Sequence, residues 1–231
     1  MQVTVFDYFD EIRIINLPGR IDRRREMDDE LKLLGLLQDP RVSYFPAIRP
    51  DNQGSFSSIG ARGVYESQKN ILCEASTANK SILILEDDCE FIMGAQNHVM
   101  PEDWMIFYGG YEAANPNELI TSDIIGAHMM GFSRQGARLV SAYLENLDYD
   151  GQHPPIDAAY IWFRRAYPEV STYFAVPPLA QQRSSRSDIA DLKWFDKLPV
   201  VRALAGSFRA FQRKFTRTRS SASHQSAIFR G

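Results

Sequence analysis

A short apolar run that ends in an acidic cluster constrains this chain more than any other stretch. Four apolar residues, Ile82 to Leu85, are followed at once by Glu86, Asp87 and Asp88. Such a run is typical of a strand buried on both faces of a mostly parallel sheet. Ligand sites of open α/β sheets lie just beyond the carboxyl ends of the strands, and carboxylates there can hold a hard cation whose shell substrate phosphates complete. The pattern therefore predicts a functional edge at residues 86–88; the alternative is a solvent-exposed acidic turn.

The remaining sequence alternates between strand and helix patterns. Further strands are predicted at residues 11–17, 42–47, 104–110, 126–132 and 171–176. Helices are predicted from a cap at Asp22 to Gly35, at 61–76, after a cap at Ser133, and after a cap at Asp157. Residues 111–124 form a predicted loop long enough to be functional, and 181–188 are expected to be irregular. This alternation predicts an α/β fold, a single domain with a central, mainly parallel sheet flanked by helices.

The charges divide the chain into an acidic body and a basic tail. Residues 1–196 contain all 29 acidic residues against 18 Lys and Arg, and residues 197–231 contain eight Lys and Arg and no acid. We expect a first domain at 1–196, a basic amphipathic helix at 197–219 and a disordered end at 220–231. Such a helix suits an anionic membrane surface, and the alternative is that it packs on the body. The acidic body disfavours nucleic acid as a partner.

Cysteine usage and the start of the chain indicate a cytoplasmic protein. Cys73 and Cys89 show no C-x-x-C spacing, which suggests a reducing compartment. The first ten residues lack a basic segment followed by an apolar one, and no apolar run approaches the ~20 residues that cross a bilayer. The basic helix would hold the protein at the inner face of the cytoplasmic membrane.

Four arginines surround the turn between the first strand and the first helix: Arg20, Arg23, Arg24 and Arg25. Backbone N–H groups at a helix N-terminus and guanidinium groups both bind phosphate. Cations are disfavoured at a helix N-terminus by the macrodipole, so four of them favour an anion site over a merely solvated helix start. The glycines form neither a dinucleotide fingerprint nor a P-loop, which argues against an ordinary NAD enzyme or P-loop ATPase.

Seven short motifs follow one another along the body of the chain. They are Ile15-Asn16-Leu17 with Arg20 and Asp22-Arg23-Arg24, Gly63-Val64-Tyr65-Glu66-Ser67-Gln68, Leu85-Glu86-Asp87-Asp88, Phe107-Tyr108-Gly109-Gly110, Gly126-Ala127-His128, Pro155-Ile156-Asp157 and Ser187-Asp188-Ile189. Their order resembles glycosyltransferase family 25, which includes lipopolysaccharide galactosyltransferases and is related to the collagen galactosyltransferases. Val64 and Gln68 depart from that family's usual Cys and His.

The resemblance implies a GT-A-like fold and transfer of a hexose from a nucleotide sugar to a cell-surface glycan or lipopolysaccharide. The implied donor is UDP-galactose or a relative, the implied cofactor is a divalent cation, usually Mn²⁺, and the implied displacement is inverting. The residues expected to contact the donor are Asn16, Leu17, Arg20, Arg24, Ser67, Glu86, Asp87, Gly109, His128 and Asp188.

We expect Asp88 to be the direct metal ligand, assisted by Glu86. Alternate residues of an extended chain point to the same side, so Asp87 would not easily join them. An inverting transfer also needs a base that takes the proton of the acceptor hydroxyl, and Asp157 is the candidate. The alternative for Asp157 is a helix cap, and for His128 it is a core histidine.

Two other functions remain open on the sequence. The departures at Val64 and Gln68 would suit a degenerate transferase that binds a nucleotide sugar without turning it over. A metal-dependent phosphohydrolase would explain the carboxylates, but neither the Asn16-Leu17 opening nor the closing Ser187-Asp188-Ile189.

Overall fold

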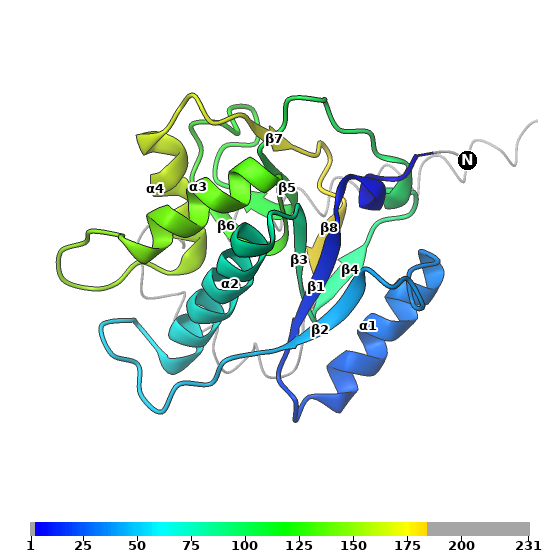
Figure 1. The fold of residues 1–231 in the computed structure, drawn as a ribbon, viewed down its shortest axis with the longest axis horizontal. Helices are drawn as coiled ribbons and strands as arrows, with labels where there is room; N and C mark the ends of the chain where they lie inside the picture. The colour runs from blue at the N-terminus through cyan, green and yellow to red at the C-terminus, as the bar shows by residue number, and fades with distance from the viewer. Residues whose placement is uncertain (1–2, 184–231) are drawn as a thin grey trace, which may run out of the picture. The chain divides into compact units, whose positions relative to one another are not determined.

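Six strands form the central sheet in residues 3–183, the part of the chain that the structure, a computed structural model, describes. They lie in the order β2-β1-β3-β6-β5-β7, and β6 alone runs antiparallel to its neighbours (Figure 1). The bounds are β1 Glu11–Asn16, β2 Val42–Pro46, β3 Ile82–Glu86, β5 Ile106–Ala113, β6 Ile124–Phe132 and β7 Thr172–Phe174. The predicted α/β class and mainly parallel sheet are confirmed.

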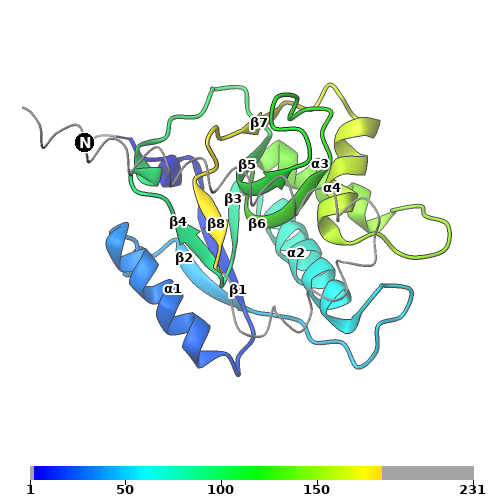
Figure 2. The ribbon, with the colours of Figure 1, turned by 180° about the vertical axis from the view of Figure 1, so that it is seen from behind.

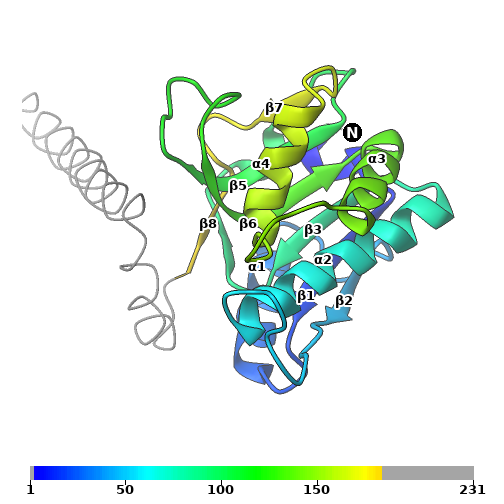
Figure 3. The ribbon, with the colours of Figure 1, turned by 90° about the vertical axis from the view of Figure 1, so that its left-hand side faces the viewer.

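Helices cover both faces of this sheet. The helices of the described residues are α1 Ile21–Leu33, α2 Ile59–Ala78, α3 Arg134–Glu145 and α4 Ile156–Ala166, with 3-10 turns η1 Val5–Tyr8 and η2 Ala95–Asn97. Figures 1 and 3 show α2, α3 and α4 on one side of the sheet and α1 on the other. Each side has its own apolar core, and the strands supply both.

The strand β3 is buried on both faces, as its apolar run predicts. Ile82 and Ile84 pack into the core formed with α2, α3 and α4, whereas Leu83 and Leu85 pack into the core formed with α1. All four side chains are fully buried. Parallel pairing with β1 and antiparallel pairing with β6 place β3 in the middle of the sheet. Its carboxyl end therefore has a fixed position, with strands on either side.

Several predicted boundaries differ from the structure. The strand β5 continues to Ala113, so the predicted loop 111–124 shrinks to residues 114–123. Two short strands went unpredicted: β4 Cys89–Phe91 pairs antiparallel with β8 Ala180–Gln182, as Figure 2 shows. Gln181 and Gln182 of β8 belong to the stretch 181–188 that is predicted to be irregular, because its polar residues show no apolar alternation. The extended form of β8 depends on a partner about 90 residues earlier in the chain.

Of the three predicted helix caps at Asp22, Ser133 and Asp157, the structure confirms Ser133, and the other two are wrong. Ser133 Oγ accepts from the Gly136 N–H and caps α3, as predicted. The helix α1 begins at Ile21 rather than at a cap on Asp22, whose carboxylate is instead bound by the Arg20 side chain. The helix α4 begins at Ile156, so Asp157 lies within its first turn and is not the N-cap residue.

The predicted basic helix at 197–219, the tail at 220–231 and Asp188 lie outside the described residues. The boundary at residue 196 lies outside them as well. Within residues 3–183, no helix has the length and apolar character needed to cross a membrane.

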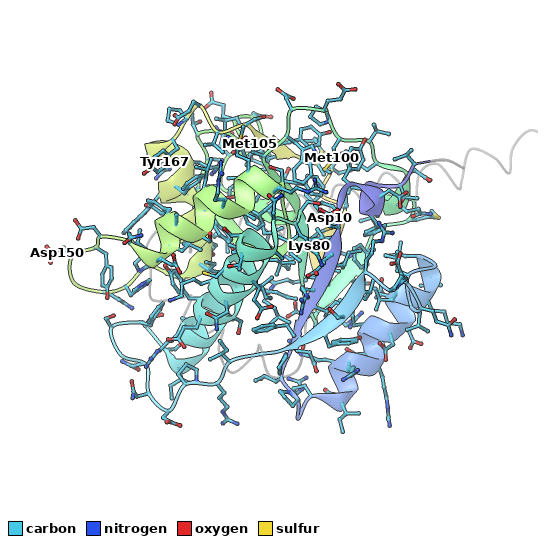
Figure 4. The ribbon with its side chains drawn as sticks, in the orientation of Figure 1. Asp10, Lys80, Met100, Met105, Asp150 and Tyr167 are labelled. Carbon is cyan, nitrogen blue, oxygen red and sulfur yellow. The ribbon has the colours of Figure 1, made fainter. Side chains whose placement is uncertain are left out.

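Asp10 joins three elements at the amino-terminal edge of the sheet, opposite the carboxyl ends of β1 and β3. Its carboxylate accepts from the Ser81 N–H at 2.9 Å, just before β3, and from both Nε and Nη2 of Arg134 at the start of α3. Figure 4 shows Asp10 beside Lys80, where β1 and β3 begin. The hydrogen bonds from Arg134 are the main cause that lowers the pKa of Asp10 from 3.8 to about 2.

We expect Asp10→Asn to lower the free energy of unfolding at pH 7 by about 1–2 kcal/mol, because charge-assisted hydrogen bonds are lost at a partly exposed site. The folded pKa lies below the unfolded one, so the wild-type advantage is present above pH 4 and disappears as the pH falls toward 2. Urea unfolding at pH 7 and pH 3 measures this. Asp150→Asn, on an exposed loop, should change neither value; an equal loss at both pH values would contradict the prediction.

Candidate active site

Asp87 and Asp88 form the turn that follows β3, and both contact one arginine. Arg23 Nη1 donates to Asp87 Oδ1 at 2.9 Å and to Asp88 Oδ2 at 3.2 Å. The expectation that Asp87 would not easily join Asp88 is wrong, because both aspartates contact the same arginine. The reason is that the extended chain ends at Glu86, and the next two residues turn before β4 begins. The fourth acidic residue, Glu90, is exposed in β4.

The first strand and its following turn supply the other contacts of Asp87. Ile15 pairs with Glu86 across the parallel strands, so Asn16 comes level with Asp87. Asn16 Nδ2 donates to Asp87 Oδ2 at 2.7 Å and also to the Arg20 carbonyl at 3.3 Å. Asn16 and Asp87 are both buried. The motif that contains Asn16 and the motif that contains Asp87 therefore meet at one edge of the sheet.

Two glutamine side chains hold Glu86 from different elements. Gln68 Nε2, on α2, donates to Glu86 Oε1 at 3.3 Å, and Gln182 Nε2, on β8, donates to Oε2 at 3.2 Å. Gln68 is fully buried, and its Oε1 accepts a hydrogen bond of 2.7 Å from the Tyr160 hydroxyl on α4. Each Glu86 oxygen thus has an amide donor, and the Gln68 amide is itself held by Tyr160.

The carboxyl group of Glu86 differs chemically from its two neighbours. Burial raises its pKa to about 8, and the negative charges of Asp88, Asp157 and Asp87 add to the rise. The Asp87–Asp88 pair instead has the guanidinium of Arg23 as its counter-charge, and the carboxylates in turn raise the pKa of Arg23 against the effect of burial. Three consecutive acidic residues thus occupy two different electrostatic environments.

Asp157 belongs to the same edge although it comes about 70 residues later. Its Oδ2 accepts from the Gly126 N–H at 3.3 Å, and its Oδ1 accepts from the Ala158 N–H at 2.9 Å. Gly126 lies near the start of β6, which is antiparallel to β3 and therefore begins at the edge where β3 ends. Its charge is one of the causes that raise the pKa of Glu86. Burial raises the pKa of Asp157 itself, and these backbone donors partly oppose the rise.

His128 is a core residue of β6 that lies next to this edge. It is buried, and its Nε2 lies 3.0 Å from the Ala180 carbonyl. A neutral ring that donates from Nε2 satisfies this contact, and burial lowers the pKa of His128 to about 4. A side chain at Gly110 would collide with the ring, because its Cβ would lie 2.5 Å from His128 Nε2. The glycine on β5 therefore makes room for the histidine on β6.

Three of the predicted donor contacts lie between the end of β1 and the first turn of α1. Leu17 is 40% exposed, and Nε and Nη2 of Arg20 donate to the carboxylate of Asp22. The Arg24 guanidinium lies over the ring of Tyr44, 4.2 Å from its centroid. These three residues follow the carboxyl end of β1, which lies beside the end of β3.

Two other predicted donor contacts are engaged inside the protein. Ser67 is fully buried, and its hydroxyl donates to the Gly63 carbonyl and accepts from the Ile48 N–H. Gly109 is buried in β5, where its carbonyl accepts from the Leu179 N–H. Both residues therefore hold backbone segments together around the edge. Their assignment to the donor stays a prediction.

Arg23 Nη1 lies where the carboxylates of two consecutive residues converge, and the expected divalent cation at this edge stays a prediction. Two carboxylate oxygens from consecutive residues converge on this nitrogen, so a positive charge already marks a point that oxygen ligands share. No group of three or more His, Cys, Asp and Glu side chains within residues 3–183 could hold a metal ion. Cations of the Mg²⁺ and Mn²⁺ type commonly use one or two carboxylates together with substrate phosphates. The assignment of Asp88 and Glu86 as metal ligands stays a prediction.

The sequence did not predict that Arg23, Tyr160 and Gln182 contribute side chains to this site. Arg23 stood among four arginines, and nothing local distinguishes the one that reaches the carboxylates. Tyr160 reads as part of the apolar face of α4, and Gln182 depends on the unpredicted pairing of β4 with β8. Only Arg23 had a usable signal, because it lies in the motif Asp22-Arg23-Arg24.

Comparisons with known proteins found neither a matching family model nor a matching curated protein. One similar solved structure is a glycosyltransferase involved in the glycosylation of the major capsid of PBCV-1, with 11% identity, a TM-score of 0.48, and coverage of 77% of this chain and 96% of that one. Another is the CTP:phosphocholine cytidylyltransferase LicC from Streptococcus pneumoniae, with 8% identity, a TM-score of 0.37, and coverage of 81% and 99%. Both TM-scores lie below 0.5, so function has to be argued from the site itself.

We expect Gln68→Leu to lower the free energy of unfolding by about 1–3 kcal/mol, because it leaves the buried Tyr160 hydroxyl without its acceptor. Tyr160→Phe removes the same hydrogen bond from the other side. The double variant should therefore lose less than the two single losses together, by about 1 kcal/mol.

Urea unfolding of the four proteins measures this cycle. Tyr167→Phe, at a more exposed tyrosine at the end of α4, is the matched control. Strictly additive losses would show that the Gln68–Tyr160 contact does not couple the two side chains.

Proposed function

We propose that this protein is a glycosyltransferase that moves a hexose, galactose in the first instance, from a UDP-sugar to a cell-surface glycan or lipopolysaccharide acceptor. The observation that carries the proposal is the meeting of four carboxyl groups, Arg23 and Asn16 at one edge of the sheet. They come from three of the motifs that resemble family 25. A GT-A-like fold, a nucleotide sugar as donor and an inverting displacement belong to the same proposal.

The donor would lie over the end of β3, with its diphosphate beside the turn between β1 and α1. Arg20 lies in that turn, and Arg23 and Arg24 lie in the first turn of α1. Because α1 begins at the edge where β1 ends, its unbonded backbone N–H groups would lie at the same edge. The predicted divalent cation would neutralise charge on the leaving diphosphate. Glu86, with both oxygens held by amides, is placed to contact hydroxyl groups of the donor.

Asp157 is the proposed base for the acceptor hydroxyl. A general base works best when its pKa lies near the working pH, and burial moves the pKa of Asp157 in that direction. Two backbone N–H groups fix the orientation of its carboxylate. Its position at the start of α4, facing Glu86, would place it on the side of the donor away from α1.

The expected acceptor, the expected cytoplasmic location and the expected contact with an anionic membrane follow from the sequence alone. They remain part of this proposal. A donor screen addresses the chemistry directly: UDP release is measured from several UDP-sugars in Mn²⁺ with purified bacterial oligosaccharide acceptors.

We expect UDP release that depends on an acceptor. Calorimetric binding of UDP-sugars without any turnover would favour the alternative, a degenerate module that only binds nucleotide sugars. Absence of both binding and turnover would contradict the proposal.

We expect Asp157→Asn to reduce kcat by about 10²–10⁴-fold while unfolding stability changes little, because an amide keeps an acceptor oxygen but cannot take a proton. The wild-type rate should rise with pH through the raised pKa of Asp157, since the base must be ionised, and the variant should lose this rise. Initial rates from pH 5 to 9 measure both effects. Asp148→Asn, on an exposed loop or turn, is the control; near wild-type turnover by Asp157→Asn would remove this residue from the mechanism.

A further inference from the structure

Arg164 is a buried arginine of α4 that holds the loop between β5 and β6. It is only 7% exposed, and its guanidinium lies over the rings of Tyr108 and Phe174, 5.3 and 5.2 Å from their centroids. Burial of a charge costs much more than burial of an apolar side chain of the same size, unless hydrogen bonds compensate it. Here Nη1 and Nη2 donate three hydrogen bonds of 3.1 Å to backbone carbonyls of the loop, those of Leu119, Ile120 and Ser122.

This loop lies at the edge of the sheet where the acidic residues gather. The strand β6 is antiparallel to both β3 and β5, so residues 114–123 join β5 to β6 at the edge where β3 ends. Within the loop, the Ser122 N–H donates to the Glu118 carbonyl, and the Ala114 N–H donates to the Asp123 carbonyl. The loop is therefore a compact turn, and Arg164 holds its second half, directly before β6 begins.

A bulge near the start of β6 directs the Gly126 N–H toward Asp157. The pairing between β5 and β6 shifts there, so that residues 126–128 lie opposite Tyr111 alone. Gly126 has a φ of +83°, which a glycine adopts without strain. Bulges change the direction of groups along a strand and are common next to active sites. At this bulge the Gly126 N–H donates to Asp157 Oδ2 at 3.3 Å.

The two contacts of α4 with this segment lie on one face of the helix. Arg164 comes seven residues after Asp157, and two turns of an α-helix take about seven residues. Only three residues separate Ser122, whose carbonyl Arg164 holds, from Gly126. The position of the loop therefore restricts the position of the Gly126 N–H. Burial raises the pKa of Asp157, and the Gly126 N–H is one of the backbone donors that oppose this rise.

We infer that Arg164 is a positioning residue for Asp157: by fixing the loop before β6, it keeps the Gly126 N–H at the carboxylate of the base. The catalytic part of this inference rests on the proposed function, in which Asp157 takes the proton of the acceptor hydroxyl. Its consequence is that Asp157 keeps one orientation toward the acceptor side. Arg164 itself touches no reacting atom and acts through the loop.

Nuclear magnetic resonance of the Gly126 amide tests the positioning without any substrate. Arg164→Met removes the three donors and keeps a side chain of similar length. We expect its Gly126 amide to change chemical shift and to exchange with solvent at least about tenfold faster than in the wild type, relative to the amides of residues 129–131 in the middle of β6, because the loop before it opens locally. If Arg164→Met does not fold, Arg164→Lys takes its place with the same expectation, since an ammonium lacks the fork that reaches three carbonyls.

Arg165→Met is the matched control. Arg165 holds Asp123 of the same loop, but through an ion pair whose side chains are both more than half exposed, and such pairs contribute little. Its Gly126 amide should stay near the wild type. An unchanged Gly126 amide in the Arg164 variant, or an equal change in Arg165→Met, would overturn the inference.

Turnover of a UDP-sugar tests the catalytic part. We expect Arg164→Met to lower kcat about tenfold with little change in the KM of the donor, because a misoriented base binds no donor but takes the proton less often. In the Asp157→Asn background the same substitution should cause no further loss, since the group that it positions is already removed. A full additional loss in that background would overturn the inference. If the wild type transfers no sugar, the proposed function fails, and the Gly126 amide alone still decides whether Arg164 positions Asp157.

Discussion

Three consecutive carboxyl groups at the end of a strand buried on both faces are the constraint on which this site depends. The strand β3 cannot shift, since its four apolar side chains are divided between two cores. The charge must therefore be accommodated where the strand ends. The surroundings do this in two ways. Asp87 and Asp88 share the cation Arg23, whereas burial raises the pKa of Glu86 and two amide groups donate to its oxygens. Neighbouring residues of one chain thus acquire different chemistry.

Local patterns were sufficient to predict the frame of the molecule. The apolar run at residues 82–85 indicated a strand buried on both faces, and the rule that ligands bind at carboxyl ends placed the site at its end. The order of the motifs brought Asn16 and Asp157 into the same hypothesis. Both residues lie at that edge: Asn16 donates a hydrogen bond to Asp87, and the charge of Asp157 contributes to the raised pKa of Glu86. Their catalytic and binding roles remain predictions.

The details that failed depend on contacts between distant parts of the chain. From the sequence, the sides toward which Asp87 and Asp88 point could be predicted only by assuming that the chain stays extended after Glu86. The chain instead turns at these two residues before β4 begins. The turn exists because β4 pairs with β8, which carries Gln182 to Glu86 from about 100 residues away. Strands as short as β4 and β8, with three residues each, leave no periodic pattern in a single sequence from which their pairing could be predicted. The departure at Gln68 was likewise uninterpretable until Tyr160 was seen to hold its amide.

The site also joins the two sides of the sheet. Asp87 and Asp88 are held from the side of α1, by Arg23, whereas Glu86 is held from the side of α2 and α4, by Gln68 and through it Tyr160. Asp157 belongs to this second side. A donor bound over the end of β3 would therefore have cationic groups beside its diphosphate on one face and a carboxylate beside its sugar on the other. An inverting displacement would need this separation, because the acceptor hydroxyl attacks from the face opposite the leaving group and the base that takes its proton must lie on that face; a sheet edge with a different helix on each side would supply it.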